Sequence, residues 1–81
     1  MPYPNEHAAR VRDPALFQPD SFRSKELARG VRVIIGKLKG SSSMAVQAYR
    51  FAANQYTAAE AKEWLKQNGV KYISFEPAIN R

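Results

Sequence analysis

Apolar residues are densest between residues 31 and 51, where two patterns typical of β-strands follow one another. The first, VRVIIGKL from Val31, is rich in β-branched residues and almost continuously apolar up to Gly36, as in a strand that the rest of the fold covers. The second, MAVQAYRF at residues 44–51, alternates its side chains with the period of two that a strand requires. We therefore expect two antiparallel strands joined by a turn at residues 40–43, with the first strand in the centre of the sheet.

The segment QYTAAEAKEWLKQNGV, residues 55–70, contains the helix that the sequence specifies best. Thr57 and Glu60 have the spacing of a capping box, in which each side chain accepts a hydrogen bond from the other residue's backbone N–H. Apolar residues then recur at steps of three and four, which gives the helix one face to pack on the sheet, and Gly69 is suited to end it. After the helix, KYISFE at residues 71–76 predicts a short third strand, which Pro77 stops.

Residues 1–19 hold four of the five prolines and show neither strand nor helix periodicity, which predicts an irregular N-terminal arm. Within the arm, DPALF has the aspartate cap and following proline of a short helical turn, and its Leu16 and Phe17 would attach the arm to the core. The next segment, DSFRSKELARG, predicts a short first helix over residues 21–29 that ends at Gly30.

Together these elements predict an α+β fold with a β-β-α-β core. The main helix carries the chain back along the sheet, so the third strand must run parallel to the second, and it has two possible neighbours. We expect it beside the central first strand, in a three-stranded antiparallel sheet of order 3-1-2 with the helix on one face. The chain then divides into an irregular arm (residues 1–19), a single α+β domain (20–78) and a frayed tail (79–81).

The length and composition allow one small domain and exclude several classes of protein. With 81 residues, of which 44% are hydrophobic and 25% charged, the chain suits a single modest core. The absence of cysteine removes disulfides and a thiolate nucleophile, and the single histidine cannot build a zinc site without cysteine partners. The sequence has no signal-peptide pattern and no apolar run near the roughly 20 residues of a membrane helix, so we expect a soluble protein without a membrane partner.

The formal net charge of +6 is concentrated in residues 23–39, which contain six arginines and lysines against Glu26 alone. The glycines and lysines of GKLKGSSS, residues 36–43, also suggest a phosphate-binding loop or a flexible contact loop. A P-loop, however, places its lysine after the second glycine and opens a helix, whereas here the lysines precede that glycine and a strand pattern follows. A hairpin turn is therefore the expected structure.

The sequence contains no clear catalytic constellation. A nucleophile needs a base beside it, and His7 has no recognisable partner in the arm, so a satisfied surface histidine is the simpler interpretation. Glu60 and Glu63 lie three residues apart, but the capping box uses the first and the second points toward solvent. We expect no catalytic residue, no metal site and no cofactor.

Nucleic acid is the alternative partner for the basic segment, because the aromatic residues of the predicted sheet can stack on bases. These residues are Tyr49, Phe51, Tyr72 and Phe75. In so small a domain they are needed for the core, and RGVRVIIG lacks the aromatic signature of an RNA-recognition strand. A solvated or protein-binding basic face is the preferred interpretation.

Five segments give a resemblance that covers most of the chain, from about residue 4 to 78: EHAARVRDPALF, DSFR, GVRVIIGKLKG, AVQAYRF and TAAEAKEWLKQNGVK. Together they resemble a small uncharacterised module from tailed bacteriophages and prophages, and the EA..WL ending is similar to that of phage proteins associated with head-maturation proteases. These motifs are structural rather than catalytic, and the chain lacks any peptidase constellation. The resemblance therefore implies phage origin and assigns no catalytic residue.

We accordingly expect a non-enzymatic phage or prophage protein that binds a phage or host protein, in head assembly or in modulating a host factor. It would act in the bacterial cytoplasm or in the virion. The alternatives are a basic nucleic-acid-binding accessory protein and a detached piece of a phage enzyme. An irregular arm has little structural need for its many polar residues, so these residues and the middle basic segment form the expected contact surface. Its residues are Glu6, His7, Arg10, Arg12, Arg29, Arg32, Lys37 and Lys39. The sequence leaves the oligomeric state open.

Overall fold

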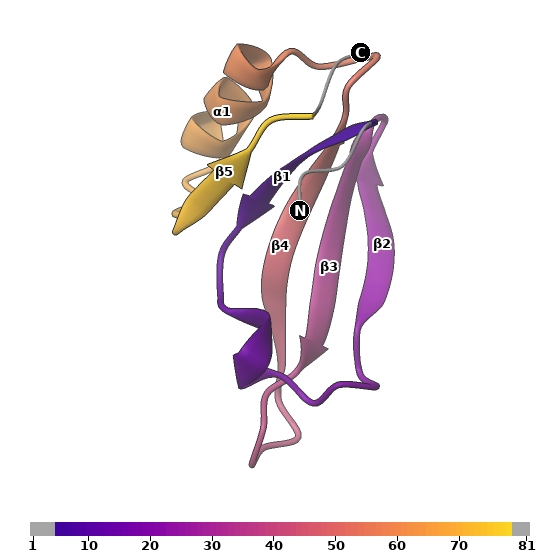
Figure 1. Cartoon of the computed structure of the whole chain (residues 1–81), viewed down its shortest axis with the longest axis vertical. Helices are drawn as coiled ribbons and strands as arrows, with labels where there is room; N and C mark the ends of the chain where they lie inside the picture. The colour runs from indigo at the N-terminus through magenta and orange to yellow at the C-terminus, as the bar shows by residue number, and fades with distance from the viewer. Residues whose placement is uncertain (1–4, 79–81) are drawn as a thin grey trace.

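A computed structural model describes residues 5–78 as one antiparallel β-sheet of five strands with a single α-helix packed on one face (Figure 1). The elements in chain order are β1 (Glu6–Arg10), the 3-10 turn η1 (Pro14–Leu16), β2 (Arg23–Ala28), β3 (Val31–Lys37), β4 (Met44–Ala52), α1 (Ala58–Gln67) and β5 (Ser74–Glu76). The strands lie in the order β2-β3-β4-β1-β5, so β4 is in the middle of the sheet. The predicted three-stranded sheet of order 3-1-2 is therefore wrong.

The first additional strand, β1, comes from the segment predicted as an irregular arm. It pairs with β4 over all five of its residues and with β5 over three of them. The sequence EHAAR has little intrinsic strand preference, but pairing on both sides and the burial of His7, Ala8 and Ala9 compensate for this. Tertiary context has overridden local propensity here.

The second additional strand, β2, replaces the short helix predicted over residues 21–29. It forms a hairpin with β3 around the two-residue connection Arg29–Gly30, and Gly30 has the positive φ of 80° that the prediction assigned to the end of a helix. A helix here would have had only a sparse apolar side to bury. As a strand, the same residues instead satisfy the backbone groups along one edge of β3.

The direction of the last strand was predicted correctly, but its neighbour was not. Strand β5 runs parallel to β4, because both are antiparallel to β1. It lies beside β1 instead of β3, since β1 takes the place next to β4 and offers its other edge to β5. The helix connection thus passes over an intervening strand that the sequence pattern did not reveal.

Helix α1 has the predicted ends. The Thr57 side chain accepts a hydrogen bond from the Glu60 N–H, and the Glu60 carboxylate accepts one from the Thr57 N–H, at 3.1 and 2.8 Å. At the other end Gly69 has φ 67°, and the Val70 N–H donates to the Leu65 carbonyl at 2.9 Å, as in a Schellman motif. The sequence therefore defined this helix through local hydrogen bonds.

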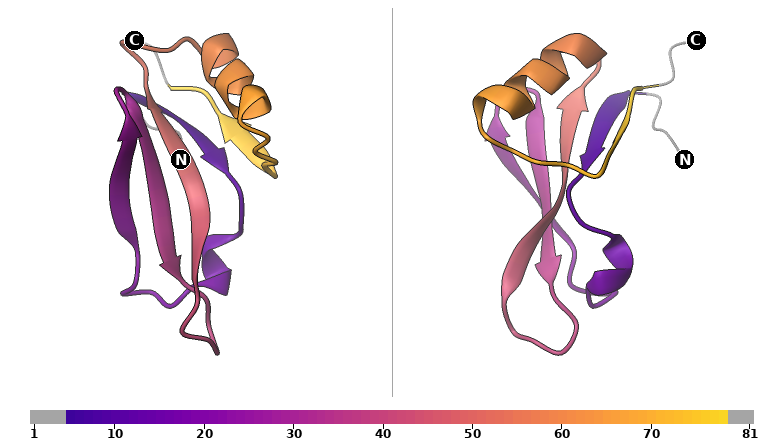
Figure 2. Two further views of the ribbon diagram at one scale, coloured as in Figure 1. Left: turned by 180° about the vertical axis from the view of Figure 1, so that it is seen from behind. Right: turned by 90° about the vertical axis from the view of Figure 1, so that its left-hand side faces the viewer.

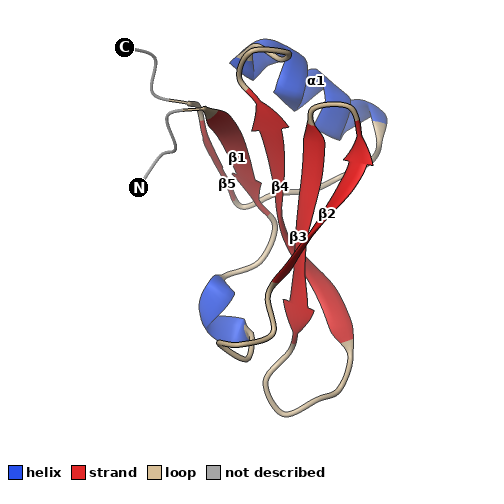
Figure 3. Cartoon of the chain, turned by 90° about the vertical axis from the view of Figure 1, so that its right-hand side faces the viewer, coloured by secondary structure: helices blue, strands red, loops and turns tan. Residues whose placement is uncertain are grey.

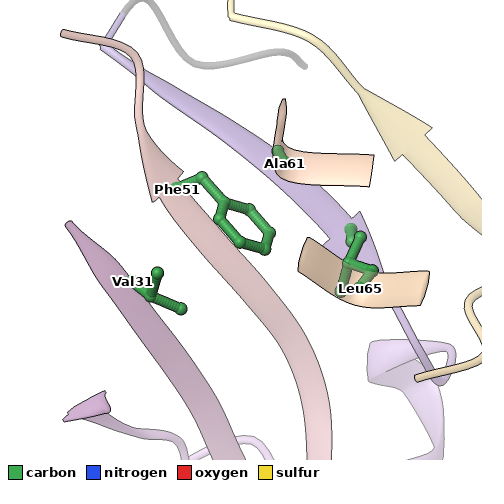
Figure 4. Close-up of a cluster of buried hydrophobic side chains, with 5 residues drawn as sticks. Val31, Phe51, Ala61 and Leu65 are labelled. Carbon is green, nitrogen blue, oxygen red and sulfur yellow. The ribbon is translucent and has the colours of Figure 1, made fainter. Parts of the chain in front are cut away.

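The main core lies between α1 and the sheet. Figure 4 shows Val31 of β3 and Phe51 of β4 facing Ala61 and Leu65 of the helix, and all four side chains are fully buried. Ala9 of β1 completes the cluster, and partly buried aromatic side chains from the helix and strands surround it. We call this side of the sheet the α1 face and the other side the opposite face.

A second, smaller packing site lies on the opposite face near the other end of the sheet. The chain crosses there from β1 to β2, and Figures 2 and 3 show η1 toward the end of the sheet away from α1. Phe17 lies against Gly36, which shares the opposite face with Arg32 through the two-residue period of β3. Asp13 caps η1 and Pro14 begins it, as predicted. Phe17 is fully buried and packs on Phe22, whereas Leu16 is 53% exposed, so only one of the two expected attachment residues enters the fold.

Candidate interaction surface

Strand β2 is the most accessible element of the sheet. Within residues 5–78 it pairs with β3 alone, at one edge of the sheet (Figure 1). All six of its residues are exposed. In an edge strand, alternate residues direct their backbone N–H and C=O groups away from the sheet, where they can pair with another chain. Two apolar side chains accompany this edge: Leu27 is 49% exposed and Phe22, just before the strand, is 37% exposed.

The register places the side chains of β2 in two rows. Arg23 and Lys25 lie opposite Ile35 and Val33 of β3, and Val33 lies opposite Tyr49, which packs against Trp64 of the helix. This row therefore belongs to the α1 face. Ser24 and Glu26 belong to the opposite face, and Leu27 sits in a β-bulge where the register shifts.

A charged cluster on the opposite face connects three strands. Arg32 and Arg50 are directly opposite each other in the β3–β4 pair, and Glu6 of β1 forms an ion pair with each. The Arg32 guanidinium donates to both carboxylate oxygens of Glu6 at 2.8 Å, while the Arg50 guanidinium approaches Glu6 at 3.4 Å. Arg32 also donates to the Ser24 hydroxyl at 2.9 Å. The structure thus brings together Glu6 and Arg32, two of the predicted contact residues, in an internal ion cluster.

His7 is buried instead of lying at the surface, contrary to the sequence-based interpretation. It is 7% exposed, stacks on Phe75 with 6.1 Å between ring centroids, and uses both ring nitrogens. The Ala78 N–H donates to Nδ1 at 2.8 Å, and Nε2 lies 2.8 Å from the Tyr56 carbonyl oxygen. Because a backbone N–H can only donate, Nδ1 accepts and Nε2 carries the proton. His7 therefore connects β1 to the segments before α1 and after β5.

The other predicted contact residues do not form one patch. Arg10 is exposed on β1, and Arg12 donates to the Val46 carbonyl at 2.8 Å, next to the bulge in β4. Arg29 lies in the turn before β3, whereas Lys37 ends β3 and Lys39 follows it. The seven residues of β3 separate these two ends by about 20 Å.

Within the segment GKLKGSSS, Gly36 and Lys37 end β3, and residues 38–43 form the predicted hairpin connection to β4. The Leu38 N–H donates to the Ser43 carbonyl at 3.1 Å, and Gly40 has a positive φ of 73°. A strand follows it and no helix begins there, so the loop has no helix N-terminus to direct at a phosphate.

A hollow on the opposite face has a volume of about 30 Å³, enough for about one water molecule. It is lined by Ala8, Arg10, Gln47, Ala48, Arg50 and Glu76.

Within residues 5–78 no three histidine, cysteine or acidic side chains cluster as metal ligands would. In the same part of the chain, the one α-helix is too short and too polar to span a membrane.

The sequence interpretation missed Arg23, Lys25 and Leu27 as surface residues of an edge strand. RSKELA has a composition that a helix also accepts, and it lacks the apolar alternation that marks a half-buried strand. The one local feature that could have indicated the strand is Gly30, because a glycine can form the turn between two strands as well as end a helix.

Comparison with protein-family models, curated proteins and solved structures found no match to this chain.

Proposed function

We propose that the protein is a non-enzymatic interaction module that binds a partner protein by adding a strand of that partner to β2. The observation that carries this proposal is the complete exposure of β2 at the edge of the sheet. Strand addition obtains affinity from backbone hydrogen bonds and specificity from alternate side chains. It needs no cavity, which suits a chain of 81 residues with a single modest core.

The two edges of the sheet are not equivalent. Strand β5 has three residues, whereas β2 has six. Longer pairing provides more backbone hydrogen bonds to an added strand. We therefore place the contact on β2. Of the contact residues predicted from the sequence, Arg29 belongs to this surface, because it directly follows β2.

We further propose that the module comes from a tailed bacteriophage or prophage and acts in head assembly or in modulating a host factor. Its support is the sequence resemblance across EHAARVRDPALF, GVRVIIGKLKG and TAAEAKEWLKQNGVK. Identification of the neighbouring genes tests this part. Portal or protease genes beside it would support head assembly, and a neighbourhood without phage genes would contradict the origin.

Nucleic-acid binding, the alternative, receives less support from the arrangement of charges. Arg32 is engaged by Glu6, and Arg29 lies at the other end of β3 from Lys37 and Lys39. If four basic residues nevertheless neutralised phosphates of duplex DNA, log affinity would fall with log salt at a slope of about −3.6. We expect no binding to duplex DNA at low salt, and a slope of that size would favour the alternative.

Site-specific photocrosslinking in the cell of origin tests the strand-addition proposal. A photoreactive residue placed at Leu27 is expected to capture one defined protein, because that side chain is exposed beside the edge of β2. The matched control places the same residue at Lys66, which is exposed on α1. Equal capture from both positions, or capture from Lys66 alone, would contradict a contact at β2.

A further inference from the structure

The side chains of β2 indicate the chemistry of the strand that it accepts. We infer that the partner segment is extended and carries acidic residues at alternate positions, which face Arg23 and Lys25. This inference rests on the proposed function, because it concerns the occupant of the same edge. It follows from three features of β2. Ser24 on the opposite face is hydrogen-bonded within the molecule, and the cationic side chains on the α1 face have no internal counterion. The charges of the strand also oppose pairing with a second copy.

On the opposite face, Ser24 is hydrogen-bonded within the molecule. The Ser24 hydroxyl accepts a hydrogen bond from Arg32, which Glu6 holds at 2.8 Å from the far side of β4. Glu26 is directly opposite Arg32 in the β2–β3 register. The hydrogen bonds from Arg32 to Ser24 and to Glu6 connect the edge strand to β1 and hold it in place before a partner arrives, which lowers the entropic cost of pairing.

The row on the α1 face is cationic and has no internal counterion. Within residues 5–78, Arg23 and Lys25 form no ion pair and no side-chain hydrogen bond, and the same holds for Arg29 in the adjoining turn. All three side chains are exposed. This surface therefore offers positive charge that the fold itself does not use.

An added strand would place its side chains in line with this row. Directly opposite residues in an antiparallel pair have Cβ atoms about 4.5 to 5.5 Å apart, and residues two apart on one strand share a face. Two acidic residues separated by one residue would therefore meet Arg23 and Lys25. Opposite charges in this arrangement stabilise the pair, whereas like charges destabilise it.

The same charges oppose pairing of β2 with a second copy of itself. Two identical edges join antiparallel about a twofold axis perpendicular to the sheet, so residues from the same face are opposite each other. With the twofold axis near the middle of β2, the two strands align with Lys25 opposite Lys25 or with Glu26 opposite Glu26. If the axis is shifted to Ser24, Arg23 lies opposite Lys25. Because each register has like charges in contact, the edge disfavours a homodimer and favours an acidic strand.

The test uses the full chain, labelled with ¹⁵N, and a blocked synthetic peptide of about ten residues in which glutamate alternates with threonine and valine. Amide signals of residues 23–28 are expected to shift on addition of the peptide. A peptide with lysine in place of glutamate is expected to bind about three- to tenfold more weakly, since two partly solvated cross-strand ion pairs are lost.

The double variant Arg23→Glu/Lys25→Glu should reverse this preference and bind the lysine peptide better. The matched control, Lys66→Glu/Lys71→Glu, changes the net charge equally at exposed positions away from β2 and should keep the original preference. This comparison separates the local row of charge from the overall positive charge of the chain.

The possible results distinguish the partner chemistry from the mode of binding. Equal affinity of the two peptides, with shifts confined to β2, would overturn the acidic partner and leave strand addition intact. Shifts confined to other elements, or none at all, would overturn both. Concentration-dependent dimerisation through β2 would assign the edge to a second copy, and duplex-DNA binding lost in the double variant would assign it to nucleic acid; either result overturns the inference.

Discussion

Gly36 lies in β3 where Phe17 crosses the opposite face of the sheet. A Cβ atom at this position would stand 2.9 Å from the Phe17 ring and 3.2 Å from both the Phe22 ring and the Ser21 hydroxyl oxygen. Gly36 is buried, and the hydroxyl of Ser21 also accepts a hydrogen bond from the Lys37 N–H at 2.9 Å. The missing side chain thus makes room for the segment that crosses from β1 to β2.

The variant Gly36→Ala is expected to lower the free energy of unfolding by about 1 to 3 kcal/mol, because the added methyl group overpacks this site. Urea denaturation followed by circular dichroism measures the change. Phe17→Leu should cost stability alone but reduce the effect of Gly36→Ala when the two are combined. Additive effects of the two substitutions would show that the steric explanation is wrong.

His7 is the other residue whose role depends on distant parts of the chain. Replacing it with alanine is expected to cost about 1 to 3 kcal/mol, since the partly buried Tyr56 carbonyl and Ala78 N–H lose their partner. His7→Asn can retain an acceptor near the position of Nδ1 and should cost less. Hydrogen exchange at the Ala78 amide checks the mechanism: the alanine variant should lose protection there, and unchanged protection would contradict it.

At the scale of an element, α1 owes its boundaries to local hydrogen bonds at both ends. Thr57→Ala removes the acceptor for the Glu60 N–H and is expected to lower stability by about 1 kcal/mol. Thr57→Ser keeps a hydroxyl acceptor and serves as the control. Thermal or urea denaturation compares the three proteins, and an equal loss in the serine and alanine variants would show that the cap is not the cause.

Strand β2 illustrates an element that exists because of its neighbour. Its residues are all exposed, so burial of its own side chains contributes little, and the β3 backbone provides the main reason for an extended conformation. The bulge at Leu27 and the charges of Arg23, Lys25 and Glu26 are devices that discourage unspecific pairing at an edge. The same features permit a partner with complementary charge.

At the scale of the whole molecule, β1 joins parts of the chain that are far apart in sequence. It lies between β4 and β5, carries Glu6 of the ion cluster, and contributes His7 and Ala9 to the α1 face. Without it, β5 would have no strand to pair with. The division of the chain into an arm of residues 1–19 and a domain of residues 20–78 therefore has a direct experimental test.

Deletion of residues 1–10 is expected to abolish the cooperative unfolding transition, because it removes an internal strand and its ladder on both sides. Dispersion of amide signals in an NMR spectrum measures the loss. Addition of a peptide with the sequence of residues 1–12 should partly restore dispersion. A truncated chain that unfolds cooperatively would contradict the prediction and support the arm-and-domain division.

The sequence by itself determined the elements whose signals lie within a few residues. Thr57 and Glu60 specify the start of α1, Gly69 its end, and the strand pattern up to Gly36 specifies β3. Asp13 and Pro14 likewise define η1. The helix and the turn were predicted correctly because hydrogen bonds between near neighbours in the chain stabilise them. Strand β3 was predicted correctly because β-branched residues favour an extended, covered strand in most folds.

Only the tertiary structure decided which segments complete the sheet and which strand edge stays exposed for a partner. Glu6 meets Arg32 and Arg50, and Gly36 meets Phe17, through contacts between residues distant in sequence. EHAAR and RSKELA become strands because β4, β5 and β3 offer unpaired backbone groups, which no local pattern records. The candidate interaction surface follows from the same cause: an edge strand is defined by the neighbour it lacks, and that is a property of the assembled sheet.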